Sequence, residues 1–414
     1  MTRILSGRAA AARVRKLAGR SSQFDKVEPV VRRIIADVRR RGDGALRKYS
    51  AQWDGLRADA SLLVSEDETQ AAWKSASPEL KASLRVAAAN IRRFCEGQKP
   101  TEWKRTRGGI TAGQLVRPLD SVGCYVPGGR YPLVSTLLMT VIPAQVAGVG
   151  RICAVSPQPR AEVLAAAAML GVREVYRIGG AQAIAALAYG TASIPRVDKL
   201  VGPGNLYVTA AKKLVAFDCA IDFLAGPTEV VIVSDTGTPE FIAADLVAQA
   251  EHDPEALAVF ITTRDDLARQ VSRAVEKLSR GNAVARQALR RNGVILVSFS
   301  RRQSFEWANE AAAEHITVDA ADVTLVRNAG SVFVGDYSSQ AAGDYASGPN
   351  HVLPTGGVAR FRGGLSVLDF VKLISIQKLT RPGLKRIAGV VESLADTEGL
   401  RAHAESIRLR CDHA

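Results

Sequence analysis

Apolar side chains recur every three to four positions through the first quarter of the chain, a spacing typical of α-helices with one buried face. One stripe runs from Phe24 to Val38, and a second runs from Leu80 to Phe94. The turn sequence Trp53-Asp54-Gly55 lies between them. This pattern predicts that residues 25 to about 105 form helices.

From about residue 115, short apolar runs alternate with helical segments, and several of the runs end in glycines. A strand, a glycine turn and a helix, repeated in this order, are typical of a doubly wound parallel sheet. The expected strands are residues 121–126, 151–155, 174–178, 199–201, 229–233, 258–262, 294–297, 316–318 and 331–334. The expected helices of this region include residues 160–170, 181–189, 264–278 and a helix that begins after Thr238.

The predicted fold class is α/β, with two Rossmann-like doubly wound units, a helical N-terminal region and a small extended and helical C-terminal tail domain. The units lack the usual glycine fingerprint, since G-x-G-x-x-G occurs nowhere in the chain. The tail is too small to form an independent core, so we expect it to pack on a partner or on the main body. We expect an N-terminal arm at 1–24. The first α/β domain is expected to combine a helical region at 25–124 with residues 229–310, and the second to combine 125–228 with 311–350. Residues 351–414 are expected to form a tail and dimerisation domain with helices at 366–374 and 385–395.

The composition is that of a soluble globular protein, with 414 residues, 47% of them hydrophobic and 23% charged. The five cysteines are widely spaced and include no C-x-x-C, which argues against a disulfide framework and a thiolate zinc site. A reducing compartment fits this usage, so we expect a cytoplasmic protein. The run from Tyr131 to Gly150 carries no charge, but Pro132 and Pro143 within it favour a buried helix over a membrane span.

The formal net charge of +14 raises the question of a nucleic-acid partner. The basic residues are spread along predicted helices, as in Arg39-Arg40-Arg41, and no aromatic residues are interleaved with them. No recognised nucleic-acid module is present. The charge pattern therefore favours a solvated basic surface and no nucleic-acid partner.

The stretch from Ala248 to Pro254 carries the clearest chemical signal. It closes a helix for which Thr238 is a suitable N-cap and Pro239 a suitable first residue. Gln249 and His252 are three positions apart, so both project from one face of the last turn. An amide oxygen and an imidazole on one face could hold zinc, although an ordinary helix terminus would have the same spacing.

The chain has only five histidines, and four of them lie beside a carboxylate or an amide in segments rich in glycine, proline or alanine. These are His252, His315 directly after Glu314, His351 within residues 343–351, and His403 five residues after Glu398. Scattered structural histidines would not need such neighbours. The pattern indicates a site with acid–base groups near a metal, but it does not identify a substrate.

Three glycine-rich corners are expected at the carboxyl ends of strands, where parallel sheets bind ligands. They are Pro127-Gly128-Gly129, Gly179-Gly180-Ala181-Gln182 and Gly202-Pro203-Gly204-Asn205. Glycine permits close approach of a ligand to the backbone, and a helix N-terminus favours phosphate. Tight strand-to-helix turns would explain each corner equally well.

Taken together, these motifs resemble those of the histidinol dehydrogenase family, and the similarity runs from the helical region at 27–54 to Arg410. The motifs that carry it are Tyr125-Val126-Pro127-Gly128-Gly129, residues 179–188, Val201-Gly202-Pro203-Gly204-Asn205, Gln249-Ala250-Glu251-His252, Glu314-His315, Gly343-Asp344-Tyr345 and residues 350–354. Two positions depart from the family pattern. Thr228 replaces a serine that often contacts substrate, and Ala313 replaces the proline before the Glu-His pair.

The resemblance implies a zinc- and NAD-dependent enzyme with one Zn²⁺ per subunit. The implied zinc ligands are Gln249, His252, Asp344 and His403. The implied catalytic residues are Glu314 and His315, and the residues expected to contact NAD are Tyr125, Gln182 and Asn205. The implied substrate-binding residues are Thr228, Gln249, His252, His315, Asp344, Glu398 and His403.

The family reaction implies two successive hydride transfers from L-histidinol, through L-histidinaldehyde, to L-histidine, in the last step of histidine biosynthesis. Zinc is expected to hold the nitrogens of the substrate, neutral His315 to accept the alcohol proton, and Glu314 to activate the water that attacks the aldehyde. The resemblance also implies a homodimer in which the tail of each subunit completes the active site of its neighbour.

Two other functions remain open at this point. A sister zinc and NAD dehydrogenase of the same family would act on another small vicinal alcohol, such as sulfopropanediol. Glu398, together with Thr228, favours an amino alcohol, because a carboxylate repels a sulfonate. A zinc-stabilised binding protein with affinity for nucleic acid is the alternative from a different class.

Overall fold

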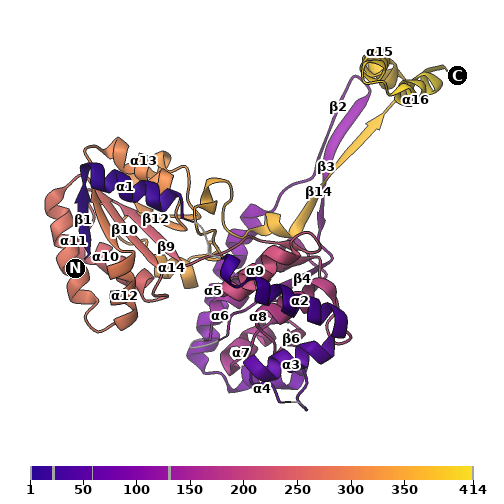
Figure 1. The fold of residues 1–414 in the computed structure, drawn as a ribbon. Coiled ribbons are helices and arrows are strands. Elements are labelled where there is room, and N and C mark those ends of the chain that lie inside the picture. The colour runs from indigo at the N-terminus through magenta and orange to yellow at the C-terminus, as the bar shows by residue number, and fades with distance from the viewer. Residues whose placement is uncertain (1, 21–23, 58, 129–131, 413–414) are drawn as a thin grey trace.

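The structure is a computed structural model that describes residues 2–20, 24–57, 59–128 and 132–412. Gly129, in the first glycine-rich corner, and residues 1 and 21–23 of the expected N-terminal arm lie outside the described residues. The chain forms two α/β bodies and a long arm that projects away from both (Figure 1). The carboxyl-terminal helices lie at the tip of this arm.

The first body is built on a six-stranded parallel sheet with strand order β1-β11-β10-β9-β12-β13. Every residue of β9 and β10 is buried, as expected for central parallel strands that helices cover on both faces. The strands are β1 (Arg3–Ser6), β9 (Glu229–Val233), β10 (Leu257–Thr262), β11 (Val294–Val297), β12 (His315–Val318) and β13 (Ser331–Val334). The helices are α1 (Gly7–Ala18), α10 (Pro239–Ala250), α11 (Asp265–Leu278), α12 (Ala283–Arg291), α13 (Arg301–Ala311) and α14 (Gln340–Tyr345), with 3₁₀ turns η2 (Ala320–Leu325) and η3 (Val358–Arg360).

The second body is built on a five-stranded parallel sheet with strand order β6-β5-β4-β7-β8. Its strands are β4 (Ser121–Tyr125), β5 (Arg151–Val155), β6 (Glu174–Tyr176), β7 (Lys199–Val201) and β8 (Ala220–Ile221). Its helices are α6 (Val134–Ala147), α7 (Ala161–Leu170), α8 (Gly180–Tyr189) and α9 (Leu206–Val215), joined by the turn η1 (Phe24–Lys26) and α2 (Glu28–Arg41), α3 (Asp43–Trp53), α4 (Glu66–Ser75) and α5 (Pro78–Gln98) from the N-terminal region.

The segments combine differently from the expected domains. Val31 and Ile34 of α2 share a hydrophobic core with Ile184 of α8, and α3, α4 and α5 likewise pack on α8, α7 and α6. The helices at 28–98 therefore cover the second sheet and not the sheet that contains β9. Residues 311–334 instead supply β12 and β13 to the sheet that contains β9. Helical periodicity identifies an apolar face but not the surface against which that face packs, which explains the wrong pairing.

Residues 3–18 of the expected N-terminal arm are part of the first body. Strand β1 pairs in parallel with β11, with Arg3 opposite Val294. Val14 and Leu17 of α1 are buried in the same hydrophobic core as Phe305 of α13. Residues 3–18 are therefore an edge strand and a covering helix.

The arm is a three-stranded antiparallel sheet with strand order β14-β3-β2. Its strands are β2 (Trp103–Arg107), β3 (Ile110–Pro118) and β14 (Val371–Leu379), and α15 (Arg381–Thr397) and α16 (Arg401–Asp412) follow them. The helix expected at 366–374 is wrong: the short turn η4 (Val367–Phe370) leads directly into β14. Nine residues of β14 pair with β3, so distant strand pairing overrides the local helical pattern.

The strand–turn–helix pattern predicted between residues 121 and 334 is confirmed. The expected strands at 151–155, 199–201, 229–233, 294–297 and 331–334 have the observed bounds. Within the uncharged run, residues 134–147 form α6, which is buried along most of its length and contains Pro143. Among the described residues, no helix is both long and apolar enough to span a membrane.

Candidate active site

The acid–base groups lie at the amino ends of two neighbouring strands, β9 and β12. Glu314 directly precedes β12, and His315 is its first residue. Helix α13 ends at Ala311, and Ala312 turns the chain in the left-handed region (φ 46°). The extended backbone that follows carries Glu314 and His315 to the edge of the sheet.

Glu314 is buried and is held by the start of β9. Its Oε2 accepts hydrogen bonds from the backbone N–H of Glu229 at 2.8 Å and from the hydroxyl of Thr228 at 2.5 Å. Burial raises the pKa of the Glu314 carboxyl to about 7. The side chain can therefore hold or release a proton near neutral pH.

His315 is buried against the same strand. Its Nδ1 lies 3.1 Å from the carbonyl oxygen of Glu229, which can only accept, so Nδ1 carries the proton. Nε2 has no hydrogen-bond partner among the described residues and lies 3.6 Å from Oδ1 of Asp344. Although burial lowers the pKa of His315, the Glu314 and Asp344 carboxylates raise it to about 9. Nε2 is thus the ring nitrogen available for proton exchange.

Gln249, at the end of α10, is linked to this pair through Thr228. Its Nε2 donates a hydrogen bond to the Thr228 hydroxyl. The amide oxygen is therefore available to coordinate a metal ion. Glu251 faces away, because its carboxylate accepts a hydrogen bond from Asn282. Gln249 and Glu251 therefore point in different directions.

Asp344 lies on α14, on the other side of His315. Burial raises the pKa of the Asp344 carboxyl, but the nearby His315 ring and the charges of His351 and His252 outweigh this effect and lower it. His252 is therefore close enough to influence Asp344 electrostatically. The structure thus brings Gln249, His252 and Asp344 into one neighbourhood with the acid–base pair.

His351 joins this group, although it is absent from the residues that sequence reasoning assigned to the site. Its Nδ1 lies 2.7 Å from the backbone carbonyl oxygen of Asp344, and burial lowers its pKa. The sequence signal for it is its place among the four histidines with polar neighbours.

Glu398 and His403 are not brought to this site by their own chain. Glu398 caps the end of α15 and His403 lies in α16, and both are exposed at the tip of the arm (Figure 1). Within the described part of a single chain, no cluster of three His, Cys, Asp or Glu side chains could hold a metal ion. An amide oxygen, an imidazole and a carboxylate are nevertheless donors that zinc accepts, so Gln249, His252 and Asp344 fit an incomplete zinc site.

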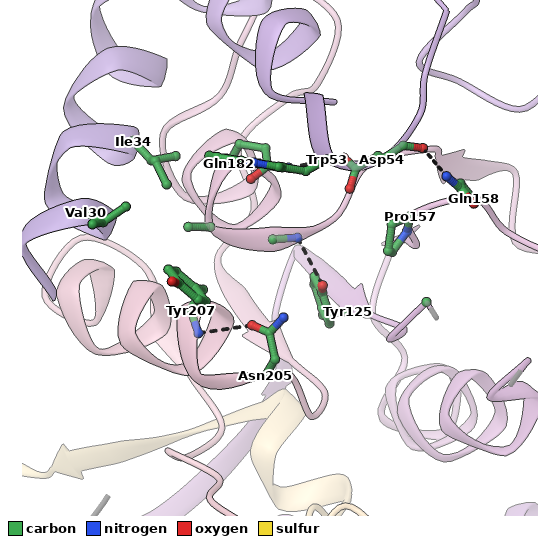
Figure 2. Close-up of a pocket in the computed structure, with 13 residues that line it drawn as sticks. Val30, Ile34, Trp53, Asp54, Tyr125, Pro157, Gln158, Gln182, Asn205 and Tyr207 are labelled. Carbon is green, nitrogen blue, oxygen red and sulfur yellow. Dashed lines mark hydrogen bonds between the residues drawn. The ribbon is translucent and has the colours of Figure 1, made fainter. Parts of the chain in front are cut away.

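A second concave site lies in the other body, at the carboxyl ends of β4, β5 and β7 (Figure 2). It is a cavity of about 510 Å³. Tyr125, Gln182 and Asn205, the three residues expected to contact NAD, all line it. The glycine-rich corners thus lie at the carboxyl ends of strands, as expected.

Hydrogen bonds fix the polar groups of this cavity. The Tyr125 hydroxyl accepts from the backbone N–H of Gly180 at 3.1 Å, and burial raises the pKa of Tyr125 to about 12. Oδ1 of Asn205 accepts from the backbone N–H groups of Tyr207 and Val208 and so caps α9. Both side chains are therefore held in one orientation before any ligand binds.

The remaining walls are largely apolar, and they include Val30, Ile34, Trp53 and Tyr207. Cavities of a few hundred Å³ with apolar walls and a few fixed polar groups are typical of cofactor sites. Oε1 of Gln182 is buried with no hydrogen-bond partner among the described residues, so it can accept a bond from a ligand. These features fit part of a dinucleotide such as NAD.

Comparisons with known proteins give one consistent result. Residues 17–411 match the family model described as histidinol dehydrogenase. Curated histidinol dehydrogenases of Methanothermobacter thermautotrophicus and Geobacter sulfurreducens are 48% and 46% identical over 401 residues, which cover 93% of this chain and 94% and 93% of those proteins. The crystal structure of histidinol dehydrogenase from Elizabethkingia anophelis superposes with a TM-score of 0.94 at 35% identity, covering 99% of this chain and 98% of that one.

Proposed function

The chain belongs to the histidinol dehydrogenase family, and we propose that it oxidises L-histidinol to L-histidine through L-histidinaldehyde at the amino ends of β9 and β12. The observation that carries this proposal is the buried pair Glu314 and His315 beside Gln249 and Asp344. Two acid–base groups next to metal-type donors suit an alcohol oxidation followed by an aldehyde oxidation.

In the first step, His315 accepts the proton of the substrate hydroxyl at Nε2 while a hydride leaves the carbinol carbon for NAD. The carbonyl of Glu229 holds Nδ1–H and so directs Nε2 outward. Nε2 has no hydrogen-bond partner among the described residues, so in the neutral ring its lone pair is free for the substrate proton. The product of this step is the aldehyde and one NADH.

In the second step, Glu314 accepts a proton from the water that adds to the aldehyde carbon. The hydrate anion formed in this way would lose its hydride to a second NAD and so become the carboxylic acid. A carboxyl with a pKa near 7 is suited to accept and return protons at neutral pH. The hydrogen bonds from Thr228 and Glu229 hold Oε2, which directs Oε1 toward the water.

We propose that Gln249, His252 and Asp344 of one chain, with His403 of a second chain, hold one Zn²⁺. When bound, the ion would offset the charge of Asp344, favour the neutral form of His315 and orient the substrate. Glu398 would accompany His403 and bind the substrate amino group. Thr228 would line the same position.

We propose that NAD binds in the cavity formed by Tyr125, Gln182 and Asn205. The phenol, the amide oxygen and the capped loop offer fixed polar contacts, and Trp53 and Tyr207 offer apolar surface for rings. Because the chain lacks the G-x-G-x-x-G motif, side chains must supply more of the contacts to NAD than the backbone does.

The proposed assembly is a homodimer in which the arm of each subunit reaches the active site of the other. The arm exposes large apolar side chains that a monomer would leave in water, including Leu373 (52% exposed), Val390 (61%) and Leu394 (59%). All five cysteines are free thiols, which supports the proposal that the protein works in the cytoplasm.

The direct test is to measure NADH formation from L-histidinol by the zinc-loaded protein. We expect two NADH for each L-histidinol consumed, L-histidine as the product, and loss of activity after chelation. Sulfopropanediol is the matched control substrate and should give no NADH. The proposal fails if L-histidinol yields no NADH, or if sulfopropanediol is oxidised in its place.

A further inference from the structure

Asp54, at the end of α3, reaches into the cavity from a segment outside the sheet (Figure 2). Its side chain is 94% buried and is the only charged group that lines the cavity among the described residues. Its Oδ2 accepts hydrogen bonds from the backbone N–H of Gly179 and from Nε2 of Gln182, both at 3.1 Å. None of the family motifs identified in the sequence includes this residue.

These bonds occupy donors that a helix N-terminus normally offers to phosphate. The backbone N–H of Gly179 faces Asp54, and that of Gly180 faces the Tyr125 hydroxyl. A pyrophosphate at this position would meet the Asp54 carboxylate. These N–H groups at the start of α8 are therefore already bonded to side chains of the protein, and a dinucleotide must use other contacts in the cavity.

The carboxylate also determines which way the Gln182 amide faces. A carboxylate only accepts hydrogen bonds, so the nitrogen of the amide must face Asp54. The oxygen is then left buried and without a partner among the described residues. An unpaired buried acceptor is costly, and a ligand donor that reaches it gains a strong bond.

Asp54 is itself held from a second direction. Its backbone carbonyl accepts a hydrogen bond from Nε2 of Gln158 at 2.7 Å. Trp53, its neighbour, stacks on Tyr49 with the ring centroids 5.0 Å apart. The end of α3 is thus fixed against the loop after β5, which holds in place the backbone from which the carboxylate projects.

We propose that Asp54 is a positioning residue for the cofactor: it fixes the Gln182 amide so that Oε1 accepts an N–H or O–H group of the dinucleotide. This inference rests on the proposed NAD site. It assigns Asp54 a role in cofactor affinity and none in proton transfer, so substrate affinity and the chemical step should be unaffected by its loss.

The test is to measure NADH binding by fluorescence titration of the zinc-loaded wild type and three variants. Asp54→Ala should weaken binding about 5- to 100-fold, the usual effect of leaving buried polar groups unpaired. Asp54→Asn should stay within a few-fold of the wild type, because one amide oxygen can accept both bonds that Oδ2 accepts. Asp43→Ala is the matched control: it releases the other end of α3 from Ser193 without touching the cavity.

A double variant separates positioning from general destabilisation. If Asp54 acts through Gln182, then Asp54→Ala adds little to the loss already caused by Gln182→Ala. Steady-state assays should show a raised KM for NAD with kcat and the KM for L-histidinol nearly unchanged. Additive losses, or an equal loss in Asp43→Ala, would overturn the inference.

The same titrations distinguish a wrong role for Asp54 from a wrong cofactor site. A wild-type protein that binds no NADH would remove the cofactor site and the role of Asp54 together. A wild-type protein that binds NADH, with Asp54→Ala binding it equally well, would remove the role of Asp54 alone.

Discussion

At the scale of single residues, the backbone of Glu229 positions both acid–base groups. The N–H of Glu229 binds Glu314, and the carbonyl of Glu229 binds His315. The Glu229 carboxylate is held in turn by Arg20 at 2.5 Å and by the backbone N–H of Gly356 at 3.0 Å. The acid–base pair is therefore positioned by the start of β9, which is anchored to the end of the N-terminal helix.

The roles of Glu314 and His315 can be separated by assaying the two half-reactions. Glu314→Gln should slow aldehyde oxidation more than alcohol oxidation, because the amide cannot take a proton from water. Proton transfer by a positioned group contributes about 10²- to 10⁴-fold. His315→Ala is the comparison and should slow the alcohol step strongly. Equal losses in both steps for Glu314→Gln, with L-histidinaldehyde supplied directly, would exclude the water-activating role.

Thr228 links Gln249 to Glu314 through its hydroxyl. Thr228→Val keeps the shape but leaves the Gln249 N–H and one bond to Glu314 unpaired, so kcat/KM for L-histidinol should fall about 10- to 100-fold. Thr228→Ser retains the hydroxyl and should stay within a few-fold of the wild type. A fully active Thr228→Val would show that this link has no catalytic consequence.

The sequence indicated most of these residues but not their connections. The pattern of polar histidines and the family motifs point to Gln249, Glu314 and Asp344, and the structure brings them together. The bonds from the Glu229 backbone and the placement of Asp54 depend on how distant segments fold against each other. No local pattern records such contacts, and the roles of the individual residues remain predictions.

At the scale of elements, the sheets were predictable because their strands are short apolar runs between glycine turns. β9, for example, is buried along its whole length, and the four residues after Glu229 form a continuous apolar run. β14 was missed because it has no core of its own: its residues are mostly exposed, and its register comes from β3. The packing of α2 against α8 was missed because an apolar stripe shows which face of a helix is buried but not which element covers it.

The base of the arm is anchored to the second body by Asp369 of η4. Its carboxylate accepts from Lys199 at 3.1 Å and from the backbone N–H of Ser366 at 2.9 Å, and it also pairs with Arg362. These partners lower the pKa of the Asp369 carboxyl although burial raises it. The ion pair between Asp369 and Lys199 is therefore largely buried, unlike the ion pairs at the tip of the arm.

Asp369→Ala should lower the free energy of unfolding by about 1.5–3 kcal/mol, the usual worth of hydrogen bonds to charged groups. Urea unfolding followed by circular dichroism measures this loss. Asp396→Ala is the control, since its exposed pair with Arg408 should contribute less than about 1 kcal/mol. Equal effects of the two changes would show that Asp369 does not anchor the arm.

At the scale of the whole molecule, the candidate active site lies where the two bodies meet. Nδ2 of Asn90 in α5 donates to the carbonyl of Ala346, and Nδ2 of Asn350 donates to the carbonyl of Met139 in α6. The segment from Asp344 to Asn350 therefore joins the first sheet to helices of the second body. The arm carries α15 and α16 away from the two bodies (Figure 1), and with them Glu398 and His403.

Removal of the metal should abolish turnover and leave the fold largely intact. The proposed ligands come from a helix end, a short helix and the arm, whereas separate hydrophobic cores hold the two bodies together. Circular dichroism and NADH formation, measured before and after chelation, test this. If the helical signal collapsed together with the activity, the metal would be structural.

The most direct test of the account is to recombine two inactive variants, because a site built from two chains makes their defects complementary. His252→Ala damages the part of the zinc site carried by the body, and His403→Ala the part carried by the arm. When the two are denatured and refolded together, each heterodimer has one site with all four ligands and one site that lacks both histidines. We predict that NADH formation from L-histidinol returns in the mixture and is absent from either variant refolded alone. If mixtures with heterodimers verified by mass remain inactive, the arm does not complete the site of its neighbour.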